Sequence, residues 1–162
     1  MMTGDQGLAV VPLLAALSAV AALLSAALTA GLFAAFSIAV MPALNAEPPA
    51  VATATMRRIN KVIIRPTFLV PFFGGPVFAA VAALLSDRAA AMPYWVAATV
   101  LLLGSVLPTM ARNVPLNRAL DRREGPAEFG DYARTWTFWN DLRALAGLAA
   151  VAAIAVALTR AG

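Results

Sequence analysis

Long apolar runs constrain this chain more than any other feature of its sequence. The first extends from Leu8 to Met41, 34 residues without a charged side chain. As a helix at about 1.5 Å per residue it would be roughly 50 Å long, whereas the hydrocarbon core of a bilayer is about 30 Å thick. This helix must therefore tilt, project from the membrane or break. Three further runs follow, so the sequence predicts four spans, at about residues 8–41, 67–86, 94–110 and 144–159.

The composition supports a membrane protein and removes several kinds of chemistry. Of the 162 residues 62% are hydrophobic and 12% are charged, about half the charge of a soluble domain. Cys and His are absent, which excludes disulfides, thiolate nucleophiles, imidazole catalysis and metal ligation by either residue. We therefore expect an all-α integral membrane protein. Its single domain is predicted to be an up-and-down four-helix bundle with short interfacial helices on the cytoplasmic side.

The basic residues are concentrated in two loops, and this predicts the topology. Four lie between the first two spans, and six lie from Arg112 to Arg143, together ten of the twelve in the chain. The positive-inside rule makes both loops cytoplasmic and both termini external. The net charge of +4 thus indicates topology, and no nucleic-acid partner is expected. The many Ala and Arg residues suggest a bacterial protein of the inner membrane. Residues 53–65 are predicted to form an amphipathic interfacial helix or a cytoplasmic extension of the next span.

Two features of the spans bear on how the helices pack. Ser18, Ala22, Ser25 and Thr29 fall on one helix face, which predicts a seam of small residues where helices approach closely. Lining of a pore or ligand site is the alternative for that face. In the second span, Pro66, Pro71 and Pro76 with the pair Gly74-Gly75 are expected to kink and bury the first half. That kink either shapes packing alone or opens a cavity.

The stretch from Asn113 to Arg143 is polar and aromatic and lies between two apolar runs. The pair Gly125-Pro126 is expected to split it in two. Asn113 and Asn117 are four residues apart and share one predicted helix face. A second face carries Phe129, Tyr132, Trp136, Asn140 and Arg143.

Polar side chains of both loops are expected to meet at the cytoplasmic mouth of the bundle. Each has an ordinary structural explanation, because tryptophans anchor interfaces, arginines snorkel and asparagines cap helices. Taken together they suit an aromatic ligand with phenol or carbonyl oxygens. The candidate set is Arg57, Asn60, Arg112, Asn113, Asn117, Trp136, Trp139, Asn140, Asp141 and Arg143.

Four segments resemble the DUF1772, or anthrone oxygenase, family of small four-span membrane proteins. They are GLFAAFSIAVMPAL (31–44), MRRIN (56–60), NVPLNRAL (113–120) and W-x-x-W-N-x-x-R (136–143). The last two are the most specific. The resemblance implies oxidation of an anthrone, a tricyclic phenol, to a quinone by O₂ without a bound cofactor.

If the protein catalyses that reaction, each candidate residue has an expected role. Trp136 and Trp139 would stack the ring, and Asp141 is the nearest carboxylate for a base. The oxyanion would accept hydrogen bonds from Arg143, Arg57, Asn113 and Asn117. Preorganised donors of this type commonly contribute a few kcal/mol each. Asn60, Arg112 and Asn140 are expected to contribute to substrate binding. The alternative is a protein without enzymatic activity that binds a lipid or hydrophobic molecule, or that assembles with partners, including a second copy.

The topology can be tested directly. A reporter fused at residue 90, between the second and third spans, is expected to lie outside the cell because both basic loops lie inside. Alkaline phosphatase activity of that fusion measures the location. An inactive phosphatase fusion together with a fluorescent GFP fusion at the same residue would reverse the orientation.

Overall fold

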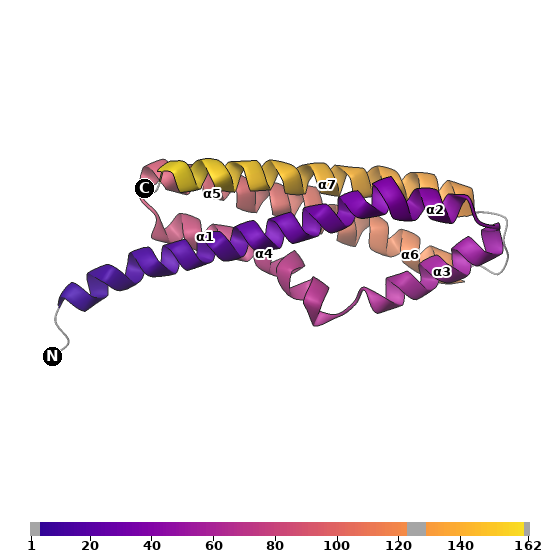
Figure 1. Ribbon diagram of the computed structural model, residues 1–162, viewed down its shortest axis with the longest axis horizontal. Coiled ribbons are helices and arrows are strands. Elements are labelled where there is room, and N and C mark those ends of the chain that lie inside the picture. The colour runs from indigo at the N-terminus through magenta and orange to yellow at the C-terminus, as the bar shows by residue number, and fades with distance from the viewer. Residues whose placement is uncertain (1–3, 123–128, 161–162) are drawn as a thin grey trace.

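The computed structural model describes residues 4–122 and 129–160, and the regular elements in these ranges are helices (Figure 1). The predicted break at Gly125-Pro126 lies outside the described residues. In chain order the elements are α1 (Gly4–Ala35), the π-helical turn η1 (Phe36–Val40), α2 (Met41–Asn45), α3 (Pro49–Val62), α4 (Pro66–Leu85), α5 (Arg88–Leu101), the π-helical turns η2 (Leu102–Val106) and η3 (Thr109–Asn113), α6 (Val114–Arg122) and α7 (Phe129–Arg160).

Four long helices form the predicted up-and-down bundle. Helices α1 and α5 each pack against both α4 and α7. The start of α1, the connection from α4 to α5 and the end of α7 lie at one end of the molecule, and α2, α3 and α6 lie at the other (Figure 1). The described chain has four continuous stretches long and apolar enough to cross a membrane, 10–45, 66–85, 88–122 and 129–160. The protein is therefore a multi-pass, all-α membrane protein, and its orientation stays a prediction.

The half of the bundle nearest the termini is packed by small side chains. Its core is mostly alanine, with Tyr94, Leu101 and Ile154 as the larger members. Ala22, Ser25 and Thr29 are buried in that half, while Ser18 is half-buried. The predicted seam of small residues is thus confirmed. Small side chains let the helix backbones approach closely where lipid offers no hydrophobic drive for association.

In the described part of the chain the other half contains three π-helical turns, and each ends two positions before a proline. The hydrogen bonds that close them run from the N–H groups of Met41, Leu107 and Val114 to carbonyls five residues earlier, and Pro42, Pro108 and Pro115 follow. A proline cannot donate to the carbonyl four residues back, and its ring collides with that carbonyl. Widening the turn by one residue carries the helix past the proline. The first span, predicted to end at about residue 41, therefore continues through Pro42 to Asn45.

Helices α3 and α4 also depart from the sequence-based expectation. Helix α3 begins at Pro49 rather than Thr53, because proline suits the first helical turn. Helix α4 is continuous through Pro71 and Pro76, and the first residues, Pro66 and Thr67, are exposed. The expected burial of its whole first half is wrong. That segment instead turns Phe68 and Phe72 toward the interior cavity described below.

The contact between α1 and α7 depends on a glycine. A Cβ added at Gly147 would lie 2.7 Å from the Ala30 Cβ and 3.1 Å from its Cα. Gly147→Ala should therefore separate the helices and cost about 1–3 kcal/mol of stability, measured by thermal unfolding in detergent. Gly31→Ala is the matched control, because nothing lies within 4 Å of the added Cβ, and it should not lower the melting temperature. Equal melting temperatures for both variants would contradict the close contact.

Candidate functional site

A cavity of about 310 Å³ lies in the half of the bundle that carries the π-helical turns. Its volume is at the lower end of the roughly 300–1,000 Å³ typical of small-molecule sites. Helices α1, α3, α4 and α7 surround it together with η1, η3 and α6. The lining residues are Leu32, Phe33, Phe36, Ile59, Asn60, Ile63, Ile64, Phe68, Leu69, Phe72, Phe73, Thr109, Met110, Asn113, Val114, Asn117, Trp136, Asn140 and Arg143.

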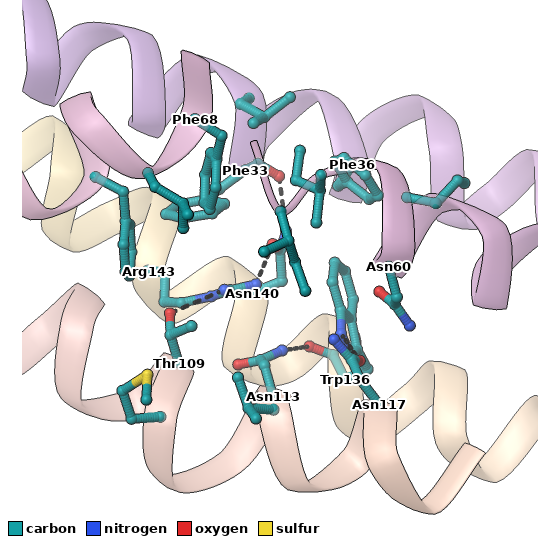
Figure 2. Close-up of a pocket in the computed structure, with 18 of the residues that line it drawn as sticks. Phe33, Phe36, Asn60, Phe68, Thr109, Asn113, Asn117, Trp136, Asn140 and Arg143 are labelled. Atoms are coloured by element: carbon teal, nitrogen blue, oxygen red, sulfur yellow. Dashed lines mark hydrogen bonds between the residues drawn. The ribbon is translucent and has the colours of Figure 1, made fainter. Parts of the chain in front are cut away.

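The cavity has an aromatic side and a polar side. Figure 2 shows Phe33, Phe36 and Phe68 along one side, with Thr109 and Asn113 opposite them. Further aromatic rings in the lining belong to Phe72, Phe73 and Trp136. Flat faces on one side and hydrogen-bonding groups on the other suit a planar molecule with oxygen substituents.

Arg143 is the charged residue of this lining, and it is almost fully buried, with 4% of its surface exposed. Its Nη1 donates to the Thr109 hydroxyl at 3.0 Å, and its Nη2 donates to the Asn140 Oδ1 at 2.7 Å. The guanidinium carbon lies 4.2 Å from the ring centre of Phe33 and 5.4 Å from that of Trp136. Within the described ranges no carboxylate forms an ion pair with Arg143. A buried cation without a counter-ion is costly, so a site for an anion is indicated.

Asn140 fixes the position of Arg143 and ties α7 to α1. Its Nδ2 donates to the Phe33 carbonyl at 2.6 Å and to the Ser37 hydroxyl at 2.7 Å, while its Oδ1 accepts from Arg143. Phe33 lies in the last turn of α1, three residues before η1, and Ser37 lies within η1. π-Helical turns often occur at functional sites because they re-aim backbone and side-chain groups.

Asn117 holds the indole of Trp136 against the cavity. Its Oδ1 accepts hydrogen bonds from the Trp136 Nε1 at 3.0 Å and from the Tyr132 hydroxyl at 2.9 Å. The ring of Trp136 packs 5.6 Å, centre to centre, from that of Phe36. The arrangement therefore presents a fixed indole face rather than a free amide oxygen.

Three buried polar atoms of the lining have no hydrogen-bond partner among the described residues. They are the Nδ2 of Asn60, the Oδ1 of Asn113 and the Nε of Arg143. Buried polar atoms are seldom left unpaired, and each exception asks for an explanation. The two donors and one acceptor belong to residues that line the cavity, and a ligand that carries matching groups is one explanation for them.

The structure brings six of the ten predicted site residues to one cavity. These are Asn60, Asn113, Asn117, Trp136, Asn140 and Arg143. The residues predicted to share one face, from Phe129 to Arg143, lie in α7, and the structure shows that this face is buried. The cavity lies between the helices rather than over their ends.

The other four candidates lie elsewhere, and geometry adds no support for their predicted roles. Arg57 donates through Nε and Nη2 to the Leu120 carbonyl, at 3.0 and 2.6 Å, and so joins α3 to α6. Arg112 lies 5.1 Å from the ring centre of Trp139. Asp141 is exposed in a separate surface depression.

Sequence reasoning missed the phenylalanines and Thr109. Phe33 and Phe36 belong to the segment 31–44 that carries the family resemblance, and Phe68 and Phe72 are one helical turn apart. That spacing could have predicted that both rings point the same way, because side chains at i and i+4 share a helix face. Thr109 had no such signal, since its partner Arg143 is 34 residues away.

The lining offers no set of metal ligands, and its chemistry is that of binding and charge stabilisation. No group of three or more Asp, Glu, His or Cys residues in the described part of the chain is placed to hold a metal ion. The donors in the lining that remain unpaired are Arg143 Nε and Asn60 Nδ2. They can stabilise a negatively charged oxygen on a planar ring.

Comparison with known proteins gives one finding. The family model described as Anthrone oxygenase matches residues 60–153, which is more than half of the chain. The matched region begins at Asn60 and contains all six predicted residues that line the cavity. No curated protein and no solved structure matches the chain.

The hydrogen bonds of Asn140 provide a test of this site. Asn140→Leu removes the bonds to Phe33, Ser37 and Arg143 and leaves buried polar groups unpaired, so it should lower the free energy of unfolding by roughly 2–4 kcal/mol. Ser37→Ala removes a single partner of Asn140 and should cost about 1 kcal/mol. Chemical denaturation in detergent measures both. A loss for Asn140→Leu no larger than that for Ser37→Ala would contradict this arrangement.

Proposed function

The chain belongs to the anthrone oxygenase family, and from this premise we propose that it oxidises a lipophilic polycyclic phenol to a quinone with O₂ and without a cofactor. The observation that carries the proposal is Arg143, a buried cation without a carboxylate partner among the described residues, set between aromatic rings in the cavity. A planar aromatic anion is the ligand that satisfies both the charge and the rings.

The anion is the reactive form of such a substrate. The methylene of an anthrone is acidic because its conjugate base delocalises the negative charge onto the carbonyl oxygen. Arg143 Nε and Asn60 Nδ2 are donors available for that oxygen, and buried donors of this kind stabilise an oxyanion far more than water does. Binding of the anion thus lowers the free energy of deprotonation.

The reaction then balances with O₂ as the oxidant. The bound anion gives one electron to O₂, and the resulting carbon radical and superoxide combine to form a C–O bond. Protonation yields a hydroperoxide on the former methylene carbon. Loss of water from this carbon leaves the second carbonyl, so one oxygen atom enters the quinone and the other leaves as water. The protein has to bind the ring, hold the anion and exclude bulk water.

The cavity suits a substrate that arrives from the membrane. Ile64 and Phe73 line it and are also 67% and 45% exposed on the outside of the helices. In a chain with four candidate spans, these side chains face lipid or the lipid–water interface. A hydrophobic tricycle dissolved in the bilayer can enter at this edge.

A second function is favoured by one observation. Among the described residues that line the cavity there is no carboxylate to accept the methylene proton, and Asp141 lies outside it. The alternative is therefore a membrane protein that binds a lipophilic aromatic anion without converting it. Under the leading proposal the proton leaves to water or to a buffer base before the anion settles against Arg143.

Turnover by variant proteins distinguishes the two. Purified protein with emodin anthrone and O₂ should form quinone faster than the uncatalysed background, and Arg143→Met should lose about 10²-fold in rate because the oxyanion loses its cation. Arg112→Met is the matched control, because Arg112 lies outside the cavity beside Trp139, and it should keep the full rate. Absorbance of the quinone and O₂ uptake provide the measurements.

Three results would each decide between the functions. Equal rates with and without protein, combined with saturable binding, would favour the binding protein. Equal losses in the Arg143 and Arg112 variants would remove the role of the buried cation. With ¹⁸O₂, a quinone without label would contradict the proposed route of oxygen.

A further inference from the structure

Asn113 lines the cavity that is defined by a cation and by aromatic rings, and its side chain contains an unpaired hydrogen-bond acceptor. The residue is 2% exposed, and it lies at the end of the turn η3. Its Oδ1 is buried and has no donor within hydrogen-bonding distance among the described residues. The same residue lines the cavity that contains Arg143.

The other half of the Asn113 amide fixes which atom is left over. Its Nδ2 donates to the main-chain carbonyl of Trp136 at 3.3 Å. Turning the amide over would set its oxygen against that carbonyl oxygen, where two acceptors repel each other. The Oδ1 is therefore held in place as an acceptor, and its donor has to come from outside the described residues.

The Asn113 Oδ1 requires a different ligand group from the other unpaired atoms of the site. Arg143 Nε and Asn60 Nδ2 are donors and suit ionised or carbonyl oxygens. Neither recognises a hydroxyl proton. Asn113 Oδ1 requires an O–H or N–H group, and leaving a buried acceptor unpaired in a complex typically weakens binding by a factor of about 10 to 100.

We propose that Asn113 is a specificity-determining residue that selects ring systems with a free hydroxyl in addition to the oxygen held by Arg143. This inference rests on the proposed function, because it takes the same cavity as the ligand site. It also restricts where the hydroxyl stands. A hydroxyl next to the ring carbonyl donates to that carbonyl within the ligand, so the hydroxyl read by Asn113 occupies a position remote from the carbonyls.

Stable quinones test this without any turnover. The probes are 2-hydroxyanthraquinone, whose hydroxyl is free to donate, 2-methylanthraquinone, which has the same size but no donor, and 1-hydroxyanthraquinone, whose hydroxyl is bonded to its own carbonyl. Dissociation constants are measured by quenching of tryptophan fluorescence in detergent, at mildly acidic pH so that the phenols stay protonated. The full-length protein is used throughout.

The quantity compared is the ratio of dissociation constants, methyl over 2-hydroxy, in each protein. The original protein should prefer 2-hydroxyanthraquinone by about tenfold or more, and 1-hydroxyanthraquinone should bind like the methyl compound. Asn113→Leu and Asn113→Ser should bring the ratio close to that of simple partitioning into detergent. Because each ratio is taken within one protein sample, a lower folded fraction in a variant does not alter it.

Thr137→Val is the matched control. Its hydroxyl is also buried without a partner among the described residues, but it borders the separate depression near Asp141. This variant should keep the original ratio. A ratio unchanged by Asn113→Leu, or lowered equally by Thr137→Val, would overturn the role of Asn113 while leaving the binding of the ring intact. If none of the three quinones bound, the proposed function would fail as well.

Discussion

The close approach of α1 and α7 is the contact on which the rest of the structure depends. At Gly147 the two helices are so near that an added Cβ would meet both the side chain and the main chain of Ala30. Two turns away along α7, Asn140 reaches the Phe33 carbonyl on α1. Glycine and alanine thus hold the helices together on the terminal side, and the larger Phe33, Phe36 and Trp136 keep space open beyond them. The cavity exists because small residues give way to large ones along the same pair of helices.

The prolines are a second constraint, and they shape the site instead of ending helices. Two of the three π-helical turns that precede a proline contribute to the cavity or its supports. The turn η1 carries Phe36 and Ser37, and η3 carries Thr109 and Asn113. In a membrane an interrupted backbone must still be satisfied internally. A widened turn does this and at the same time changes the direction in which the following side chains point.

The electrostatics of the cavity connect this architecture to chemistry. Arg143 is held by neutral oxygens and aromatic faces, which orient the guanidinium without neutralising its charge. A carboxylate partner would satisfy the cation and compete with an anionic ligand. The absence of such a partner among the described residues leaves the charge available, at a cost in stability that is common at functional sites. Membership in the anthrone oxygenase family and this uncompensated charge support the same class of ligand.

The sequence alone determined the class of the protein and singled out six of the residues that line the cavity. Long uncharged runs predicted the four apolar helices, because a segment without charge and of sufficient length has few alternatives to a helix in lipid. Helical spacing placed Trp136, Asn140 and Arg143 on one buried face of α7, and the structure confirms that face. Their polar side chains and loop positions selected Asn60, Asn113 and Asn117 as well. These predictions succeeded because they depend on residues close together in the chain.

Contacts between distant segments were decided by the tertiary structure only. Arg57, Arg112 and Trp139 have the same residue types as cavity residues, and Asp141 is next to Asn140 in the chain. None of the four lines the cavity. Which phenylalanines form the aromatic wall, and which polar atoms stay unpaired, depends on how α1, α4 and α7 are rotated against one another. That rotation is set by packing at contacts such as Ala30 with Gly147 and Phe33 with Asn140, between residues more than 100 positions apart in the chain. The residue pattern within a single helix therefore cannot predict how the helices are rotated against one another.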